Sequence, residues 1–192
     1  MIYLIDTNNI FNTHSSTLAK IIKHHTAENI ENISIPDAAS INELINIIEP
    51  LLSKVTPSDV VLAAWAVPAH PKLDELFSTL GQLCYVVVAA GNTGEPVEKY
   101  SPSRADNVTC IGCLNKLGVK ASLSNFSEML ELTWVCGTNY YVDGAPHNGT
   151  SVSAAIYTGM LAEAIRKNDI SHLFNSIAKY HTKVYNEINH KV

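Results

Sequence analysis

Four side chains suited to acyl transfer stand beside predicted strands and helices. Asp6 follows the first apolar run of the chain, and His14 stands just before the first predicted helix. Asn92 follows the strongest strand pattern, and Ser151 opens a late helix. Because sites in open α/β sheets gather at the carboxyl ends of the strands, we expect these four side chains to share one rim.

An acid, an imidazole and a hydroxyl together provide the chemistry of a nucleophilic serine. A serine hydroxyl is a poor nucleophile until an imidazole takes its proton. The imidazole in turn needs a carboxylate that fixes its tautomer and stabilises the imidazolium. The side chain of Asn92 and the backbone N–H of Ser151 could bind the oxyanion, helped by the dipole of the helix that begins there.

Each of these residues also has a structural interpretation. A serine before a helix commonly caps it, Asn92 stands between turn glycines, and Asp6 could cap the turn after its strand. His147, four residues before Ser151, is a rival base. We favour His14 because the base must approach the nucleophile from a separate element beside Asp6.

The composition excludes several classes of protein. The chain has 192 residues, of which 46% are hydrophobic and 16% are charged, and its net charge is −5. This composition excludes wholesale disorder, and the acidic balance argues against nucleic acid as a partner. No apolar run approaches the roughly 20 residues that span a bilayer, so we predict no membrane partner.

The cysteines and the N-terminus predict a cytoplasmic protein. Four scattered cysteines do not make a disulfide framework, and the first residues lack the pattern of a signal peptide. Cys110 and Cys113 form a C-x-x-C without a second pair, and on a strand they would point to opposite faces. We therefore predict core packing for both and no metal site. His24 and His25 are expected to be exposed at a helix end.

Strand and helix patterns alternate along the chain. This order predicts an α/β fold, a mostly parallel sheet with helices on both faces, in a single domain over 1–192. A helix over about 171–188 is expected to dock at the C-terminus. The predicted strands are 1–5, 33–35, 60–67, 84–90, 108–114 and 132–136, and the other predicted helices begin near residue 15 and cover 41–51, 71–80 and 152–165.

Several short strings resemble motifs of the subtilisin-like serine peptidases, the subtilases. Val86–Gly94 resembles the segment that holds the oxyanion asparagine, and Asn148–Ala154 resembles the nucleophile motif Gly-Thr-Ser-Met-Ala/Ser. Leu4–Thr7 resembles Val-Ile-Asp-Thr/Ser, and His14–Ala19 resembles His-Gly-Thr-His-Val-Ala. The order Asp, His, Asn, Ser is that of the family. Two further strings, Asn107–Gly112 and Gly118–Asn125, resemble Val-Ile-Ala-Val-Gly and Arg-Ala-Ser-Phe-Ser-Asn.

The resemblance implies a trimmed subtilisin-like domain that needs no cofactor. It implies that Asp6, His14, Ser151 and Asn92 are the catalytic residues. It also implies two substrate-binding segments, Ala64, Trp65 and Ala66, where the family usually has Ser-Leu-Gly, and Ala89, Ala90 and Gly91.

The sequence departs from the family pattern at several points. Asp6 and His14 are eight positions apart, whereas typical members place a much longer segment between them. The loop after the first helix lacks the carboxylates of a calcium site, so no structural calcium is predicted. The segment 36–40 is too short for the second strand that clamps the substrate, and Trp65 is expected to reshape the cleft. No propeptide precedes the first strand, so we expect folding to proceed without one.

These features lead to one leading hypothesis and two alternatives. The leading one is a small intracellular serine endopeptidase for a narrow peptide or protein substrate, with a partner protein that could complete the cleft. The first alternative is a pseudoprotease that binds peptide or scaffolds a complex. The second is a peptide ligase or cyclase that uses the same triad and excludes water from the acyl-enzyme.

Overall fold

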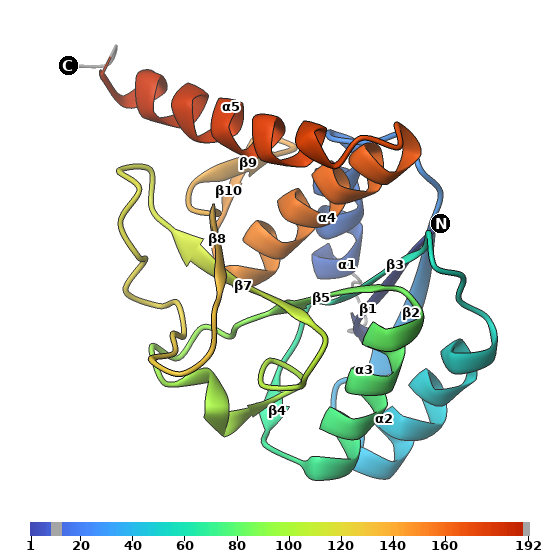
Figure 1. The fold of residues 1–192 in the computed structure, drawn as a ribbon. Helices are drawn as coiled ribbons and strands as arrows, with labels where there is room; N and C mark the ends of the chain where they lie inside the picture. Colours follow the sequence, from blue (N-terminus) through green and yellow to red (C-terminus); the bar gives the residue numbers. More distant parts are fainter. Residues whose placement is uncertain (9–12, 190–192) are drawn as a thin grey trace.

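Six parallel strands form the centre of the fold. The structure is a computed structural model and describes residues 1–8 and 13–189. The strand order is β2-β1-β3-β5-β7-β8, and every neighbouring pair runs parallel (Figure 1). The predicted α/β class with a parallel sheet is therefore confirmed. The strands are β1 (Ile2–Asn8), β2 (Ile30–Pro36), β3 (Val60–Ala63), β5 (Tyr85–Ala89), β7 (Thr109–Leu114) and β8 (Thr133–Cys136).

Helices cover both faces of this sheet. Figure 1 shows α1, α4 and α5 above the sheet and α2 and α3 below it. Each layer buries its own cluster of aliphatic side chains against the strands, as parallel sheets require. The helices are α1 (Thr13–Lys23), α2 (Ile41–Ile48), α3 (Pro71–Leu83), α4 (Thr150–Arg166) and α5 (Ile170–Asn189), with short 3-10 helices η1 (Glu49–Ser53) and η2 (Val97–Lys99). Among the described helices, none is long and apolar enough to cross a membrane.

The alternation of side chains along β1 fixes the face on which Asp6 emerges. Ile2 and Leu4 pack in the cluster beneath α1 and α4, whereas Tyr3 and Ile5 pack toward α2 and α3. Successive side chains on a strand point to opposite faces. Asp6 therefore lies on the side of α1 and α4, close to the carboxyl end of the strand.

Local signals explain where the helices on the lower face begin and end. Ser40 and Glu43 form a reciprocal capping box at the start of α2, and Pro71 stands at the start of α3. The predicted helix 41–51 ends earlier, at Ile48, and continues as η1. Pro50 has no N–H for a helical hydrogen bond, which favours the tighter 3-10 turn.

The predicted strand 60–67 divides into two strands of different sheets. β3 ends at Ala63, and the chain then leaves the central sheet. β4 (Val67–Pro68) pairs antiparallel with β6 (Tyr100–Ser101). A continuous apolar run does not reveal this change of backbone partner.

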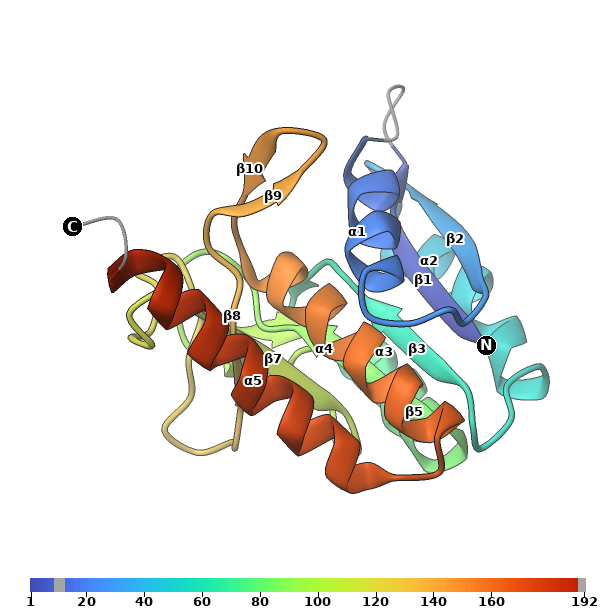
Figure 2. The same ribbon diagram turned by 90° about the horizontal axis from the view of Figure 1, so that it is seen from above.

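A hairpin that the sequence prediction did not include precedes α4. Its strands are β9 (Tyr140–Val142) and β10 (Ala145–His147). Asp143 and Gly144 form the turn with positive φ values of 50° and 80°, as a two-residue hairpin turn demands. The hairpin is tied to α1 by an ion pair between Lys20 and Asp143 and stands beside α1 in Figure 2.

The C-terminal helix α5 is present as predicted, and it changes the environment of His25. His24 is exposed, as expected, but His25 is largely buried, because Tyr180 of α5 packs edge-on against its ring. The sequence expectation of an exposed His25 is therefore wrong.

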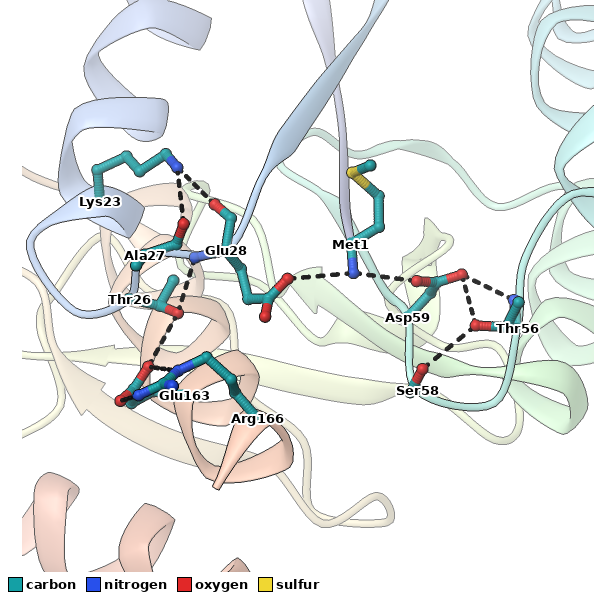
Figure 3. Close-up of polar contacts among 10 residues, drawn as sticks. All are labelled: Met1, Lys23, Thr26, Ala27, Glu28, Thr56, Ser58, Asp59, Glu163 and Arg166. Atoms are coloured by element: carbon teal, nitrogen blue, oxygen red, sulfur yellow. Dashed lines mark hydrogen bonds and ion pairs between the residues drawn. The ribbon is translucent and has the colours of Figure 1, made fainter. Parts of the chain in front are cut away.

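A polar network ties the elements together at the amino ends of the strands (Figure 3). Thr26, just after α1, donates to Glu163 of α4 over 3.3 Å, and Glu163 is also paired with Arg166. The Met1 amino group lies 3.1 Å from Asp59. This network lies at the end of the sheet opposite the carboxyl ends of the strands.

Candidate active site

Three elements bring Asp6, His14 and Ser151 together at the carboxyl ends of the strands. Asp6 lies near the end of β1, His14 in the first turn of α1 and Ser151 in the first turn of α4. α1 and α4 pack side by side on the same face of the sheet, as both views show (Figures 1 and 2). Their first turns consequently meet where β1 ends.

The three side chains form a continuous chain of hydrogen bonds. His14 Nδ1 donates to Asp6 Oδ2 over 2.7 Å. Ser151 Oγ donates to His14 Nε2 over 3.2 Å. The eight-residue spacing between Asp6 and His14 is therefore long enough for the contact.

Burial differs among the three groups in a useful way. Asp6 is 2% exposed and Ser151 is 6% exposed, whereas the side chain of His14 is 44% exposed. A carboxylate in a low-dielectric position holds its imidazole partner strongly. The imidazole of His14 is thus partly open to solvent, while the groups on either side of it are buried.

The rival base His147 lies elsewhere. It ends β10, where its backbone is paired with that of Tyr140. Within residues 1–8 and 13–189, no hydrogen bond joins His147 to Ser151, whose hydroxyl contacts His14 instead. The geometry therefore favours His14 as the base.

Asn92 is held at the start of α4 by Thr150. The Thr150 N–H and hydroxyl both donate to Asn92 Oδ1, over 2.9 and 3.1 Å. Because Oδ1 is occupied, the Nδ2 group remains available as a donor. The Ser151 N–H, in the first turn of the helix, has no intrahelical acceptor. Neither of these two donors has a hydrogen-bond partner among the described residues, and both lie at the start of α4.

Close packing requires glycine immediately before Thr150. Gly149 has a φ of +134°, and a Cβ there would lie 3.2 Å from the amide of Asn92. A side chain would both strain the backbone and press on Asn92.

Thr150 is a site residue that the sequence analysis did not single out. It is fully buried, and its hydroxyl accepts from the Gly91 N–H over 3.1 Å while donating to Asn92. Thr150 thus joins the segment after β5 to the start of α4. Its only sequence signal is its place inside the string Asn148–Ala154.

Asn125 is the second residue that the sequence analysis left without a role. Its Nδ2 donates to the carbonyl of Ala90 over 2.9 Å, and its Oδ1 accepts from the N–H groups of Thr93 and Glu95. These bonds brace the loop that carries Asn92. Asn125 ends the string Gly118–Asn125, and that was its only signal.

The first predicted substrate segment follows β3. Ala64 still donates to the carbonyl of Ile5 over 3.2 Å. The Trp65 ring packs edge-on against Phe77 of α3, with centroids 6.0 Å apart. The indole is therefore partly buried against the lower core, and contact of Ala64, Trp65 and Ala66 with substrate stays a prediction.

The second predicted substrate segment is tied into the core. Ala89 and Ala90 are buried, and their carbonyls accept from Ser103 and Asn125. Gly91 follows with a φ of +104°, and a Cβ there would lie 2.4 Å from the Asn125 amide. These contacts fix the backbone of the residues that immediately precede Asn92.

The cysteines are buried and unpaired. Burial raises the pKa of the Cys110 thiol to about 12 and that of Cys84 to about 11. Cys113 is buried as well. In the part of the chain that the structure describes, no cluster of three or more His, Cys, Asp or Glu side chains is placed to hold a metal ion.

A parallel α/β sheet with Asp, His and Ser joined at the carboxyl ends of its strands is the arrangement of a subtilisin-like serine peptidase. The family model described as "Subtilase family" matches residues 39–182, most of the chain. The chain belongs to the subtilase family. Asp6 and His14 lie before the matched segment, so the structure and not the family model places them beside Ser151.

Curated relatives match over a short segment. Subtilisin-like protease 2 and subtilisin-like protease 1 of Pseudogymnoascus destructans (strain ATCC MYA-4855 / 20631-21) are 36% and 34% identical to this chain over 55 residues. That segment is 29% of this chain and 14% of each relative.

Solved structures share the fold over much greater lengths. A cold adapted subtilisin-like serine proteinase matches with a TM-score of 0.74 and 16% identity, over 92% of this chain and 79% of its own. The prenylagaramide maturation protease PagA matches with a TM-score of 0.65 and 16% identity, over 88% and 77%. A lanthipeptide protease matches with a TM-score of 0.67 and 14% identity, over 87% and 74%. At these identities the likeness concerns the fold.

Proposed function

We propose that this chain is a serine peptidase whose catalytic residues are Asp6, His14, Ser151 and Asn92. The observation that carries the proposal is the unbroken hydrogen-bond chain from Asp6 through His14 to Ser151. Its two links are 2.7 and 3.2 Å long, within the reach that proton transfer needs.

The proposed reaction begins with the hydroxyl of Ser151. His14 Nε2 takes the proton as Ser151 Oγ attacks the scissile carbonyl, and the same nitrogen then gives the proton to the leaving amine. Asp6 keeps Nδ1 protonated, so that Nε2 can act as the base, and it stabilises the imidazolium. Water then releases the acyl group from Ser151 by the same proton transfers.

The negative oxygen of the tetrahedral intermediate is assigned to two donors. These are Asn92 Nδ2 and the Ser151 N–H, which also profits from the dipole at the start of α4. The orientation of Asn92 by Thr150 supports this assignment, because both bonds are accepted by Oδ1.

The proposed substrate is a narrow set of peptides or proteins. β2 is the outermost strand on its side of the sheet, and the chain passes from it into α2 within a few residues. A peptide held on one edge alone binds more weakly than one clamped between two strands. A partner protein that supplies the second edge belongs to this proposal.

The proposed site of action is inside the cell. The four cysteines are all buried and unpaired, which suits a reducing compartment.

The test is a comparison of new peptide ends. A complex peptide mixture is incubated with the wild-type chain or with Ser151→Ala, and the products are sequenced by mass spectrometry. The proposal expects a narrow set of cleaved peptides with the wild-type chain only, and the two products of each cleavage should together weigh one water more than the starting peptide. New peptide bonds without added water, so that the products together weigh the same as the starting peptides, would indicate the ligase or cyclase alternative. An unchanged mixture would indicate a pseudoprotease.

A further inference from the structure

A cavity lies on the α5 side of the molecule. It has a volume of about 450 Å³ and is bounded by the end of α1, β9, the segment after β7 and α5, whose arrangement Figure 2 shows. This volume is within the range of sites for small ligands and peptide side chains. The residues assigned to catalysis do not line it.

Two lysines and two histidines line this cavity. They are Lys116, Lys183, His24 and His25, and no Asp or Glu lies among the lining residues whose side chains the structure describes. Neither lysine forms an ion pair with another side chain that the structure describes, in a chain whose described side chains end at Val184, whereas Lys20, one turn before His24, is paired with Asp143. On a chain of net charge −5, this concentration of basic groups is a local feature.

The pKa of His25 is sensitive to the positive charges around the cavity. Burial, together with the smaller effects of the positive charges of His24 and Lys183, lowers the pKa of His25 to about 4. His25 therefore stays neutral near pH 7. The free positive charge of the cavity comes from the two lysines.

Aromatic side chains complete the wall. Tyr140 is bonded to His24 over 2.9 Å, and Tyr180 donates to the carbonyl of Cys136 over 2.8 Å, so both rings are held in place. Tyr141 is 62% exposed at the rim. A site with fixed rings and unpaired lysines is suited to an acidic side chain with apolar neighbours.

We propose that this cavity is an exosite that binds an acidic stretch of a peptide substrate. The inference rests on the proposed function, because it takes the bound peptide to be a substrate of the proposed peptidase. His24 directly follows α1 and is ten residues from His14, so at the helical rise per residue the cavity lies roughly 15 Å from the triad. An extended peptide covers that distance in about five residues. Acidic residues at about that separation from the scissile bond are expected to improve substrates.

Direct binding tests this inference independently of cleavage. The full chain carrying Ser151→Ala is titrated into a fluorescent Glu-rich peptide and into the same peptide with Gln in place of Glu, with anisotropy as the readout. We expect saturable binding of the Glu peptide only. We also expect the double change Lys116→Glu and Lys183→Glu to weaken it about tenfold or more.

The matched control is Lys179→Glu, which makes a single charge reversal on α5 at an exposed lysine outside the cavity. It should change the dissociation constant less than about twofold. Thermal melting confirms that each variant is folded. Equal binding of the Gln peptide, no binding of the Glu peptide, or unchanged binding by the double variant would overturn the exosite.

A second arm separates a peptide from another polyanion. A single-stranded oligonucleotide of the same charge is used as competitor, and stronger binding of the oligonucleotide than of the Glu peptide would overturn the peptide assignment. Because Ser151→Ala removes the nucleophile, a failed binding test leaves the triad proposal standing. If the chain binds the Glu peptide but the wild type cleaves no peptide, the peptide-binding site stands and the proposed peptidase function fails.

Discussion

The side chain of Asn92 has two separate tasks at the residue scale. Its Oδ1 accepts two hydrogen bonds from Thr150, and its Nδ2 remains free to donate. These two tasks can be separated by substitution, because aspartate keeps the acceptor and loses the donor.

Asn92→Asp is expected to lower kcat by about 10²–10³ or more, because an oxyanion donor is lost and a negative charge takes its place. The bonds to Thr150 can persist, so the melting temperature should change little. The measurement is kcat and KM on a cleaved peptide, beside a melting curve. A kcat within tenfold of wild type would show that Asn92 does not bind the oxyanion.

Thr150→Val is expected to reduce both stability and activity. It leaves the Gly91 N–H and Asn92 without the buried hydroxyl, which costs about 1–3 kcal/mol of unfolding free energy. Thr150→Ser keeps the hydroxyl and should restore most of kcat. Urea unfolding and kinetics on both variants give the answer, and equal activity of the two would remove Thr150 from the support of Asn92.

The site was only partly predictable from single residues. Asp6, His14, Asn92 and Ser151 could be selected because their chemical types and order match known chemistry, and the structure joins Asp6, His14 and Ser151. Thr150 could not be assigned a role, because its function lies in bonds to a loop nearly sixty positions away in the chain. Asn125 shows the same limit.

At the scale of elements, the triad depends on how closely α1 and α4 approach. Gly159 of α4 is the contact point, since a Cβ there would lie 2.8 Å from both the carbonyl of Ile22 and the Cβ of His25. Neither atom is the far end of a flexible side chain. A larger residue must therefore move one helix, and with it His14 relative to Ser151.

Gly159→Ala is expected to lower the free energy of unfolding by about 1–3 kcal/mol and to slow the reaction of Ser151 in the folded chain. Gly81→Ala is the matched control, because its Cβ would lie 2.1 Å from the carbonyl of Asn107, far from α1. It should destabilise the chain without slowing Ser151. Unfolding curves and the rate of active-site labelling measure the two effects, and equal rates for both variants would contradict the role of the helix contact.

The predictable elements were those with strong periodicity or clear caps. The helix after Ser40 and the strand before Gly91 were recognised for these reasons. The β9–β10 hairpin was missed although Asp143 and Gly144 are a typical turn pair, because its three-residue strands are too short to show alternation. The burial of His25 could not be predicted, because it depends on Tyr180 in a distant helix.

At the scale of the whole molecule, the network at the far end of the sheet should make stability depend on pH (Figure 3). In this network, the pKa of Glu163 is lowered from 4.5 to about 2, chiefly by the hydrogen bond that Glu163 accepts from Arg166. Because the folded pKa is the lower one, this contribution is fully present above about pH 4.5 and is lost as the pH falls toward about 2.

Glu163→Gln should therefore destabilise the chain near neutral pH, and its difference from wild type should shrink below about pH 4.5. Urea unfolding midpoints over this range provide the measurement. Glu128→Gln, at an exposed glutamate that forms no ion pair within the described ranges, is the control and should show no such trend. A difference that grows as the pH falls would have the wrong sign for this account.

The central claim is that His14 activates Ser151. The most direct measurement is the rate at which a fluorophosphonate probe labels the intact chain, followed by mass spectrometry, in the wild type, Ser151→Ala, His14→Ala and His147→Ala. We predict labelling of the wild type at Ser151, none in Ser151→Ala, a rate lowered by about 10²-fold or more in His14→Ala, and an unchanged rate in His147→Ala. An unlabelled wild type, or labelling that survives loss of His14 and requires His147, would contradict it.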